Sequence, residues 1–243
     1  MERIAIFAAL QWECRPILRQ LRRVTRERRA GVTVWRGTTP AGDVWLVKTG
    51  MGLARAATAA GAVTDASRFD LIVSTGCAGA LAPDLLPGDL AVASAIIDNG
   101  GAHFETNITQ REQIRRAAVR AALHVAAGPV LCSPHVLATE AEKYAAAAHG
   151  AIAVEMEGAP IAASAGHAGI PFVSVRAILD TAATELPHLG KVIDPQNGKL
   201  RPWALASYLA TQPGALPALL AMQDMRRAAQ SSLDKFFAAW LGN

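Results

Sequence analysis

The chain has 243 residues, of which 51% are hydrophobic, so it can bury a substantial core as one large α/β domain or two small ones. The sequence contains no long charged tract and no Ser/Pro-rich tract, which excludes wholesale disorder. A formal net charge of +4 is by itself weak evidence for an anionic partner.

The cysteines and the N-terminal segment indicate a cytoplasmic protein. The three cysteines form no Cys-x-x-Cys pair, so we expect neither a zinc site nor a disulfide framework. The apolar run from Ile4 to Leu10 is far shorter than the roughly 20 residues that span a membrane. It lacks a small-residue cleavage site and is soon followed by Glu13 and arginines, so we expect no signal peptide.

Strand-like and helix-like segments alternate along the chain. Short apolar segments bounded by turn residues predict strands at 3–9, 32–38, 44–49, 70–75, 89–97, 129–132, 151–155 and 171–179. Helical periodicity predicts helices at 13–23, 53–67, 110–125, 139–148, 157–167, 203–210 and 215–241. The later strands are apolar throughout, as strands covered on both faces are.

This alternation predicts a three-layer α/β/α sandwich around a central mixed, largely parallel sheet. We expect one domain over 1–243, with a long loop at about 181–202 and C-terminal helices over 203–241. In such sheets, ligands bind at the carboxyl ends of the strands.

Between Arg15 and Arg29 the sequence places seven arginines against one acid, Glu27. This segment is interpreted as a solvated helix face and turn, with contact to the phosphate head groups of an anionic membrane as the alternative. No aromatic residue is interleaved with the arginines, so we expect no nucleic-acid partner.

Glycines follow two predicted strands, in Gly50-Met51-Gly52 and in the run from Thr75 to Ala80. A dinucleotide fingerprint needs a third small residue where Arg55 stands, so the first motif is interpreted as a tight turn rather than a nicotinamide or flavin site. The second is interpreted as a turn whose small residues let a flat ligand approach the backbone. The histidines show no metal-ligand spacing, and no metal is expected.

Two acids and an arginine stand where predicted strands end, in Val154-Glu155-Met156-Glu157 and Val175-Arg176-Ala177-Ile178-Leu179-Asp180. Ionised side chains beside apolar runs usually serve a purpose. Together with Glu13, they suggest an enzyme that protonates one part of a substrate and activates water at another. Glu155 is interpreted as a strand-end residue without a chemical role, and Arg176 equally as a salt-bridge partner.

The turn Thr75-Gly76-Cys77-Ala78-Gly79, Val-Glu-Met-Glu and Val-Arg-Ala-Ile-Leu-Asp resemble the nucleoside phosphorylase and nucleosidase family, most closely its methylthioadenosine and S-adenosylhomocysteine nucleosidases. The opening Ala9-Leu10-Gln11-Trp12-Glu13 and the separation of Glu157 from Asp180 (180 − 157 = 23) are similar too. The resemblance covers roughly 3–180.

The resemblance implies three catalytic residues. Asp180 would protonate N7 of adenine, which requires a raised pKa. Glu13 would orient and deprotonate the attacking water, and Glu157 would hold the ribose hydroxyls and support an oxocarbenium-like transition state.

It also implies a substrate-binding set. Met156 would pack on the sugar and Arg176 would order the carboxylates, while Val136 and Leu137 would flank the adenine. The remaining members of the set come from the two glycine-containing segments: Met51, Cys77, Ala78 and Gly79.

Departures from the family pattern bear on the nucleophile. Cys77 stands where the family usually has serine, and Ser74 where phosphorylases have a phosphate-binding arginine. Because Glu13 would repel phosphate, water is favoured as the nucleophile, with inorganic phosphate as the alternative co-substrate and no other cofactor.

Val136 stands where nucleosidases usually have an aromatic residue. Stacking on the adenine would be weaker, so binding would depend more on the 5′ substituent. With the apolar C-terminal segment, this resembles a subgroup associated with hopanoid lipid biosynthesis, which removes adenine from adenosylhopane. The alternatives are a general methylthioadenosine or S-adenosylhomocysteine nucleosidase and a non-catalytic nucleoside- or lipid-binding module. The family also implies a homo-oligomer, with Trp35, Trp45 and Ile96 as interface candidates.

Overall fold

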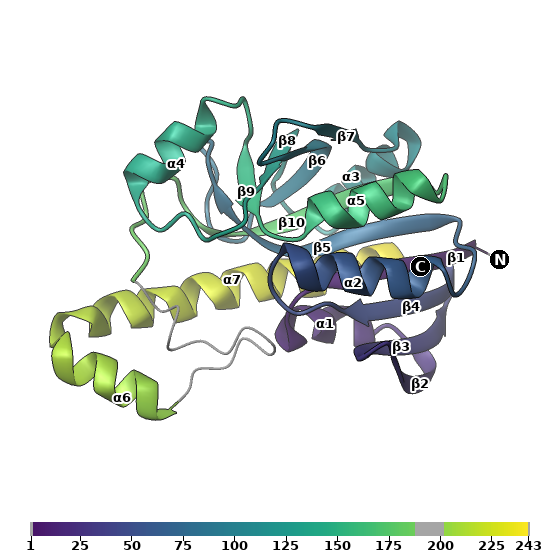
Figure 1. Ribbon diagram of the computed structural model, residues 1–243, viewed down its shortest axis with the longest axis horizontal. Helices are drawn as coiled ribbons and strands as arrows, with labels where there is room; N and C mark the ends of the chain where they lie inside the picture. Colours follow the sequence, from purple (N-terminus) through teal and green to yellow (C-terminus); the bar gives the residue numbers. More distant parts are fainter. Residues whose placement is uncertain (1, 188–201, 243) are drawn as a thin grey trace.

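The computed structural model describes residues 2–187 and 202–242. The loop expected at 181–202 therefore lies mostly outside the described residues. One mixed sheet forms the centre of the molecule (Figure 1). Its strands are β1 Glu2–Ala8, β2 Arg22–Arg29, β3 Val32–Thr39, β4 Gly42–Lys48, β5 Leu71–Ala80, β6 Leu90–Asp98, β7 His103–Glu105, β8 Val125–Cys132, β9 Ala153–Glu155 and β10 Phe172–Asp180.

The strand order is β10-β6-β8-β9-β5-β1-β4-β3-β2, with β7 paired to β6. β10 also pairs in parallel with β5, so β5, β10, β6, β8 and β9 close into a ring. β1 lies between β4 and β5 and is parallel to both. Several strands thus deliver their carboxyl ends to one side of β5.

Helices cover both faces of the sheet. Their bounds are α1 Gln11–Leu18, α2 Leu53–Thr64, α3 Ile108–Arg120, α4 Glu140–Ala147, α5 Gly158–His167, α6 Pro202–Thr211 and α7 Leu216–Leu241. Apolar side chains of α2 and α5 pack on one face, and those of α1, α3 and α7 pack on the other. The predicted three-layer α/β/α architecture is confirmed.

The C-terminal half of α7 packs through Leu233, Phe236 and Phe237, which are fully buried against the α1 side of the sheet. Figure 1 shows α6 and the first half of α7 extending away from the sheet. Trp203, on α6, is 88% exposed, and Leu216 and Leu220 on α7 are also exposed. The two C-terminal helices expected from the sequence are therefore present, but only the second has a well-packed half.

The arginine-rich segment is a strand, not the expected helix face. α1 ends at Leu18, and Arg22–Arg29 forms the edge strand β2, antiparallel to β3. In this pairing Arg26 lies opposite Trp35 and over its ring, which offers the guanidinium a cation–π contact. Cross-strand partners of this kind outweigh the local helical preference of arginine.

The run from Thr75 to Ala80 is the second half of β5 rather than a turn. β10 continues beside it, with Arg176 opposite Gly76 and Ala177 opposite Cys77. One further boundary differs from the prediction, and one strand is additional. The helix expected to reach Val125 ends at Arg120, and β7 was not predicted because a three-residue strand carries too little pattern.

The expected interface residues are also corrected. Trp35, Trp45 and Ile96 are all buried within the chain, where the two tryptophans pack on opposite faces of the sheet. They belong to the core because β3, β4 and β6 alternate their side chains into the two helical layers.

Candidate active site

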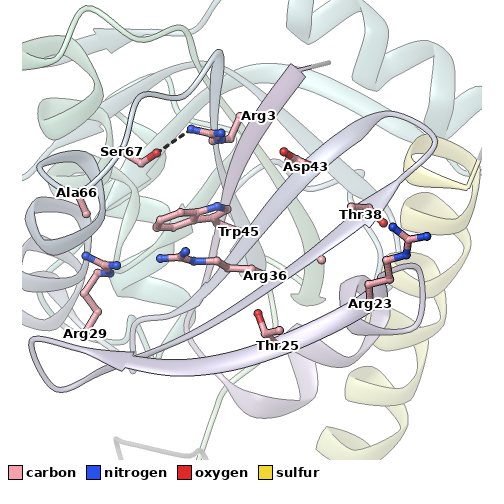
Figure 2. A pocket seen from close by; sticks show the side chains of 11 residues that line it. Arg3, Arg23, Thr25, Arg29, Arg36, Thr38, Asp43, Trp45, Ala66 and Ser67 are labelled. Atoms are coloured by element: carbon pink, nitrogen blue, oxygen red, sulfur yellow. Dashed lines mark hydrogen bonds between the residues drawn. The ribbon is translucent and has the colours of Figure 1, made fainter.

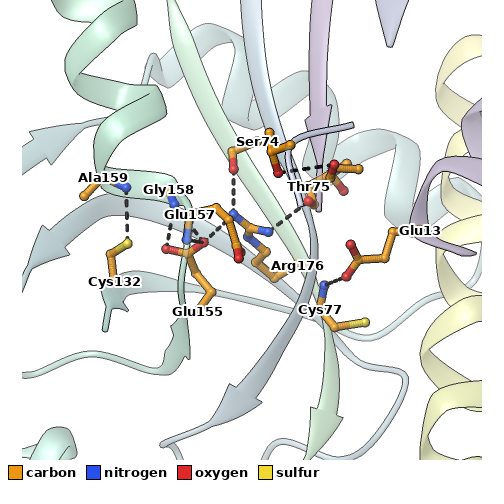
Figure 3. A network of polar contacts seen from close by, with 12 residues as sticks. Glu13, Ser74, Thr75, Cys77, Cys132, Glu155, Glu157, Gly158, Ala159 and Arg176 are labelled. Atoms are coloured by element: carbon orange, nitrogen blue, oxygen red, sulfur yellow. Dashed lines mark hydrogen bonds and ion pairs between the residues drawn. The ribbon is translucent and has the colours of Figure 1, made fainter. Parts of the chain in front are cut away.

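Arg176 lies at the centre of the site, on β10 and fully buried (Figure 3). Its Nη1 donates to the Thr75 carbonyl at 2.9 Å, and its Nη2 donates to Ser74 Oγ at 2.6 Å. Nη2 also pairs with the carboxylate of Glu155. A buried guanidinium needs such partners, because an unpaired charge in the interior is strongly destabilising.

Glu155, for which the sequence predicts no chemical role, is the counter-ion of Arg176. It ends β9, and its carboxylate accepts backbone N–H groups of Glu157 at 3.0 Å and Gly158 at 2.8 Å. These N–H groups begin α5, where the helix dipole also favours an anion. Position 158 needs glycine, because a Cβ there would lie 2.7 Å from Glu155 Oε1.

Glu157 is the N-terminal capping residue of α5, and its side chain reaches across to the turn before α2. Its carboxylate accepts the Gly52 N–H at 2.8 Å. Burial raises the pKa of Glu157 to about 8, and the charge of Glu155 adds to the rise while Arg176 opposes it. Near neutral pH in the unliganded protein, this carboxyl therefore carries its proton for much of the time.

Glu13 is buried in the first turn of α1. Its carboxylate accepts the N–H groups of Leu10 at 2.8 Å and Cys77 at 2.9 Å. Burial raises its pKa, while the Leu10 N–H and the charge of Arg176 act in the opposite direction. Glu13 and Arg176 meet at Gly76, where an added Cβ would lie 2.8 Å from Glu13 Oε1 and 3.0 Å from Arg176 Nη1.

Asp180 ends β10 beside Gly79, whose absent Cβ would lie 3.1 Å from Asp180 Oδ2. Burial raises the pKa of Asp180, and the hydrogen bond and charge of Lys143 lower it. Lys143 comes from α4 and pairs with the Asp180 carboxylate. The sequence did not predict a role for Lys143. Its burial could be inferred only from its place three residues before Ala146, on the same buried face of α4.

The structure thus places two of the predicted catalytic residues against β5 and the third beside Arg176. Glu13 binds Cys77 of β5, Asp180 lies beside Gly79 of β5, and Glu157 is electrostatically coupled to both Glu13 and Arg176. Glu13, Glu155 and Glu157 around Arg176 are called the carboxylate cluster below.

The predicted binding residues divide into two groups. Met51, Met156 and Cys77 are half-buried: Met51 precedes the glycine that binds Glu157, Met156 stands between Glu155 and Glu157, and the Cys77 N–H binds Glu13. Burial raises the pKa of the Cys77 thiol, so the thiol stays protonated. The Ala78 side chain packs in the core, because alternate residues of a strand point to opposite faces, so a contact of Ala78 with a ligand would come from its backbone.

Val136 and Leu137 lie between β8 and α4. Val136 is 57% exposed, whereas Leu137 is half-buried against the core group that includes Leu131 and Val154. The backbone of Leu186 donates to the Ala138 carbonyl at 2.8 Å, so the segment after β10 runs past this turn. No described contact joins Val136 to the carboxylate cluster.

A separate cavity of about 530 Å³ lies near the starts of β1 and β4, at the opposite end of these strands (Figure 2). Four arginines line it: Arg3, Arg23, Arg29 and Arg36. Arg36 stacks 3.6 Å from the Trp45 ring centre, and Glu27 pairs with Arg29 and Arg36. This is called the arginine cavity below.

Across the described residues, no helix is both long and apolar enough to cross a membrane.

Known proteins share this sequence pattern and this fold. The 5′-methylthioadenosine/S-adenosylhomocysteine nucleosidases of Colwellia psychrerythraea and Tolumonas auensis are 28% and 24% identical to the chain. These matches cover 75% and 76% of this chain and 85% and 89% of the relatives.

Among solved structures, the nucleosidase of the same name from Neisseria meningitidis, in complex with methylthio-immucillin-A, superposes with a TM-score of 0.79 at 18% identity. That match covers 99% of this chain and 98% of the other. The futalosine hydrolase of Helicobacter pylori gives 0.77 at 17% identity, covering 98% and 97%. The model of the phosphorylase superfamily matches residues 3–197, which include every member of the carboxylate cluster and Asp180. The chain belongs to the phosphorylase superfamily.

Proposed function

We propose that the protein is an enzyme that cleaves the N-glycosidic bond of a 5′-substituted adenosine and releases adenine. The observation that carries this proposal is the placement of Glu13 and Asp180 against β5 and of Glu157 within the charge cluster of Arg176, with the pKa of each carboxyl raised by burial. The names of the matched nucleosidases support it. A non-catalytic nucleoside- or lipid-binding module is the alternative of another class.

In the proposed reaction Asp180 donates a proton to the adenine ring, because a neutral purine leaves more readily than its anion. Burial supports this role by raising the pKa of Asp180. Gly79 supports it as well, since its missing side chain leaves the Asp180 carboxyl open toward β5.

Glu13 is the proposed base for the attacking water. The backbone N–H groups of Leu10 and Cys77 fix its carboxylate, so its orientation does not depend on the ligand. Both Nη groups of nearby Arg176 already serve Ser74, Thr75 and Glu155. This favours water over phosphate, because a phosphate ion beside Glu13 would gain little from that guanidinium.

Glu157 is proposed to hold the ribose hydroxyls. Positive charge that develops as the sugar becomes oxocarbenium-like favours the ionised form of Glu157, and this anion would in turn stabilise that charge. Arg176 holds the Glu157 backbone in place through Glu155. Met156, the residue before it, is half-buried and would pack on the sugar.

For the 5′ substituent we propose the polycyclic chain of adenosylhopane. The exposed apolar residues Trp203, Leu216 and Leu220 on α6 and α7 favour a large apolar group over a small one. The alternative is a general methylthioadenosine or S-adenosylhomocysteine nucleosidase, which the names of the matched relatives support.

A peripheral contact with an anionic membrane, by an otherwise cytoplasmic protein, is also proposed. The arginine cavity supports this contact because it concentrates four guanidinium groups, with Asp43 as the one acid among its lining residues.

We further propose that the chain forms a homo-oligomer, with the exposed residues Ile108 and Val119 of α3 as candidate contacts in place of the buried tryptophans. Light scattering tests that assembly.

The experiment is to supply methylthioadenosine, S-adenosylhomocysteine and adenosylhopane, each with and without phosphate, and to identify the products. We expect free adenine with a free reducing sugar, and adenosylhopane as the fastest substrate. A sugar 1-phosphate formed only with phosphate would make the enzyme a phosphorylase. Release from methylthioadenosine alone would make it a general nucleosidase, and no adenine from any substrate would overturn the enzymatic proposal.

A further inference from the structure

Lys143 is a lysine in an unusual place. It lies on α4, and its side chain is 1% exposed, among the largest fully buried side chains of the described residues. Burying an ammonium group costs several kcal/mol unless partners replace its water. A surface helix with two glutamates in its first turn has no structural need for a lysine on its inner face.

All three donors of the Lys143 ammonium group are occupied. It pairs with Asp180 Oδ2 and donates to the carbonyls of Thr181 and Thr184, both at 2.8 Å. The Thr184 N–H in turn donates to the Thr181 carbonyl at 3.1 Å. One side chain therefore holds the end of β10 and the turn that follows it.

The pairing is one-sided on the Asp180 carboxyl. Lys143 takes Oδ2, while no described residue donates a hydrogen bond to Oδ1. A carboxyl fixed through one oxygen can present the other in a single direction, as donation of a proton requires.

We propose that Lys143 is a positioning residue, which fixes Asp180 against the substrate base and ties the 181–184 turn to α4. The inference rests on the proposed function, since it gives Asp180 the role of the acid. It adds a residue that the sequence motifs do not single out.

Two titratable groups face Asp180 from the packed elements: Lys143 on α4 and Cys77 on β5. The thiol is held neutral by burial, so the ammonium is the charge that acts on the carboxyl. Because a neighbouring cation favours the carboxylate, removing the ammonium should raise the pKa of Asp180. A lysine with a purely structural role would change the rate without moving this pH dependence.

The test compares Lys143→Met and Lys143→Arg with the wild type, by kcat/KM of adenine release from about pH 5 to about pH 9. For Lys143→Met we expect at least a tenfold loss at the optimum and an alkaline limb at higher pH. Lys143→Arg keeps the charge and should keep the alkaline limb of the wild type. An unmoved limb in Lys143→Met, or a moved limb in Lys143→Arg, would overturn the inference.

Two controls separate the possible failures. Lys235→Met removes an exposed lysine from α7 and should leave rate and pH profile unchanged. A wild type that releases no adenine defeats the proposed function, whereas an active wild type with an unshifted Lys143→Met defeats the positioning role. Should Lys143→Met fail to fold, urea unfolding of Lys143→Met/Asp180→Asn decides. We expect this double variant to fold, because it leaves neither buried charge without its partner, and a double variant that is also unfolded would contradict the coupling.

Discussion

The side chains of the site carry more potential negative charge than positive charge. Three glutamates, Glu13, Glu155 and Glu157, surround Arg176, which within residues 2–187 and 202–242 is the one cation that bonds into their cluster. Glu155 takes the guanidinium, so burial acts on the other two with less compensation. Protonation of Glu157 relieves this excess of negative charge, as the elevated pKa of that carboxyl indicates.

Glu157 should therefore make stability depend on pH. Its pKa is 4.5 in the unfolded chain and about 8 in the folded protein, so the folded state binds the extra proton between these values. The contribution of Glu157 to the free energy of unfolding is fully present below pH 4.5 and is lost as pH rises through about 8. Over that range the free energy of unfolding falls by at most about 1.4 kcal/mol per pH unit. Glu157→Gln should flatten that slope, as measured by urea unfolding at a series of pH values.

The control is Glu112→Gln, a half-exposed glutamate that pairs with Arg115 on α3. It should follow the wild-type pH dependence throughout. If Glu157→Gln keeps the wild-type slope too, Glu157 does not hold the extra proton in the folded state.

Candidate site residues that belong to a sequence motif could be identified from the sequence. Residues whose role depends on a partner far away in the sequence could not. Glu13, Glu157, Arg176 and Asp180 stand at the ends of apolar runs, where a charge is conspicuous. Lys143 lies in an alanine-rich helix and reads as a surface residue, because its partner Asp180 is 37 positions away. The ion pair of Glu155 could not be predicted for a related reason: it forms only when the end of β9 comes beside Arg176 of β10.

At the scale of elements, β5 organises the site. Its second half carries two glycines and a cysteine, and this lack of bulk lets Glu13 approach at Gly76 and Asp180 at Gly79. Gly76 has a φ of +139°, a backbone conformation that side-chain-bearing residues rarely adopt. The strand thus has a specific need for glycine where the two sides of the site meet.

Gly76→Ala should therefore damage both stability and activity. The new methyl would lie within 3.0 Å of Glu13 Oε1 and Arg176 Nη1, so both side chains must shift. We expect a loss of roughly 2 kcal/mol or more in unfolding free energy and at least a tenfold loss in adenine release. Gly61→Ala on α2, where a Cβ meets nothing within 4 Å, is the matched control and should be neutral or slightly stabilising. Equal behaviour of the two variants would show that Gly76 is not a close-packing point.

Most elements could be predicted because their pattern is local. Apolar runs such as Ile4–Phe7 and alternating helices gave the right element types and the right order. β2 could not, because arginines carry no strand pattern and the segment becomes a strand only beside Trp35 and the rest of β3. The extension of β5 through Gly76 was missed for the same reason, since its partner β10 begins about 100 residues later.

At the scale of the whole molecule, two features lie at opposite ends of the sheet. The carboxylate cluster lies past the end of β1 and beside the second half of β5, where Glu13 binds Cys77. The arginine cavity lies near the starts of β1 and β4 (Figure 2). The layered architecture followed from the alternation of strands and helices. The ring closed by β5 and β10 did not, because only long-range pairing creates it.

The arginine cavity should bind anionic surfaces. We expect the protein to sediment with vesicles that contain phosphatidylglycerol and to remain in solution with neutral vesicles or in high salt. Arg23→Gln/Arg29→Gln should weaken sedimentation, whereas Arg227→Gln, an exposed arginine paired with Asp224 on α7, should not. Failure to bind anionic vesicles, or equal binding by the cavity variant, would remove the membrane contact and leave the enzymatic proposal intact.

The most direct test of the central claim is the rate of adenine release by the wild type and by Asp180→Asn, with the fold of both checked by circular dichroism. An asparagine keeps an oxygen for the Lys143 ammonium group but cannot donate the acidic proton. We expect adenine from a 5′-substituted adenosine with the wild type and a loss of about a hundredfold or more with Asp180→Asn. A folded Asp180→Asn protein with the wild-type rate would show that the leaving base takes its proton elsewhere and would contradict the assignment.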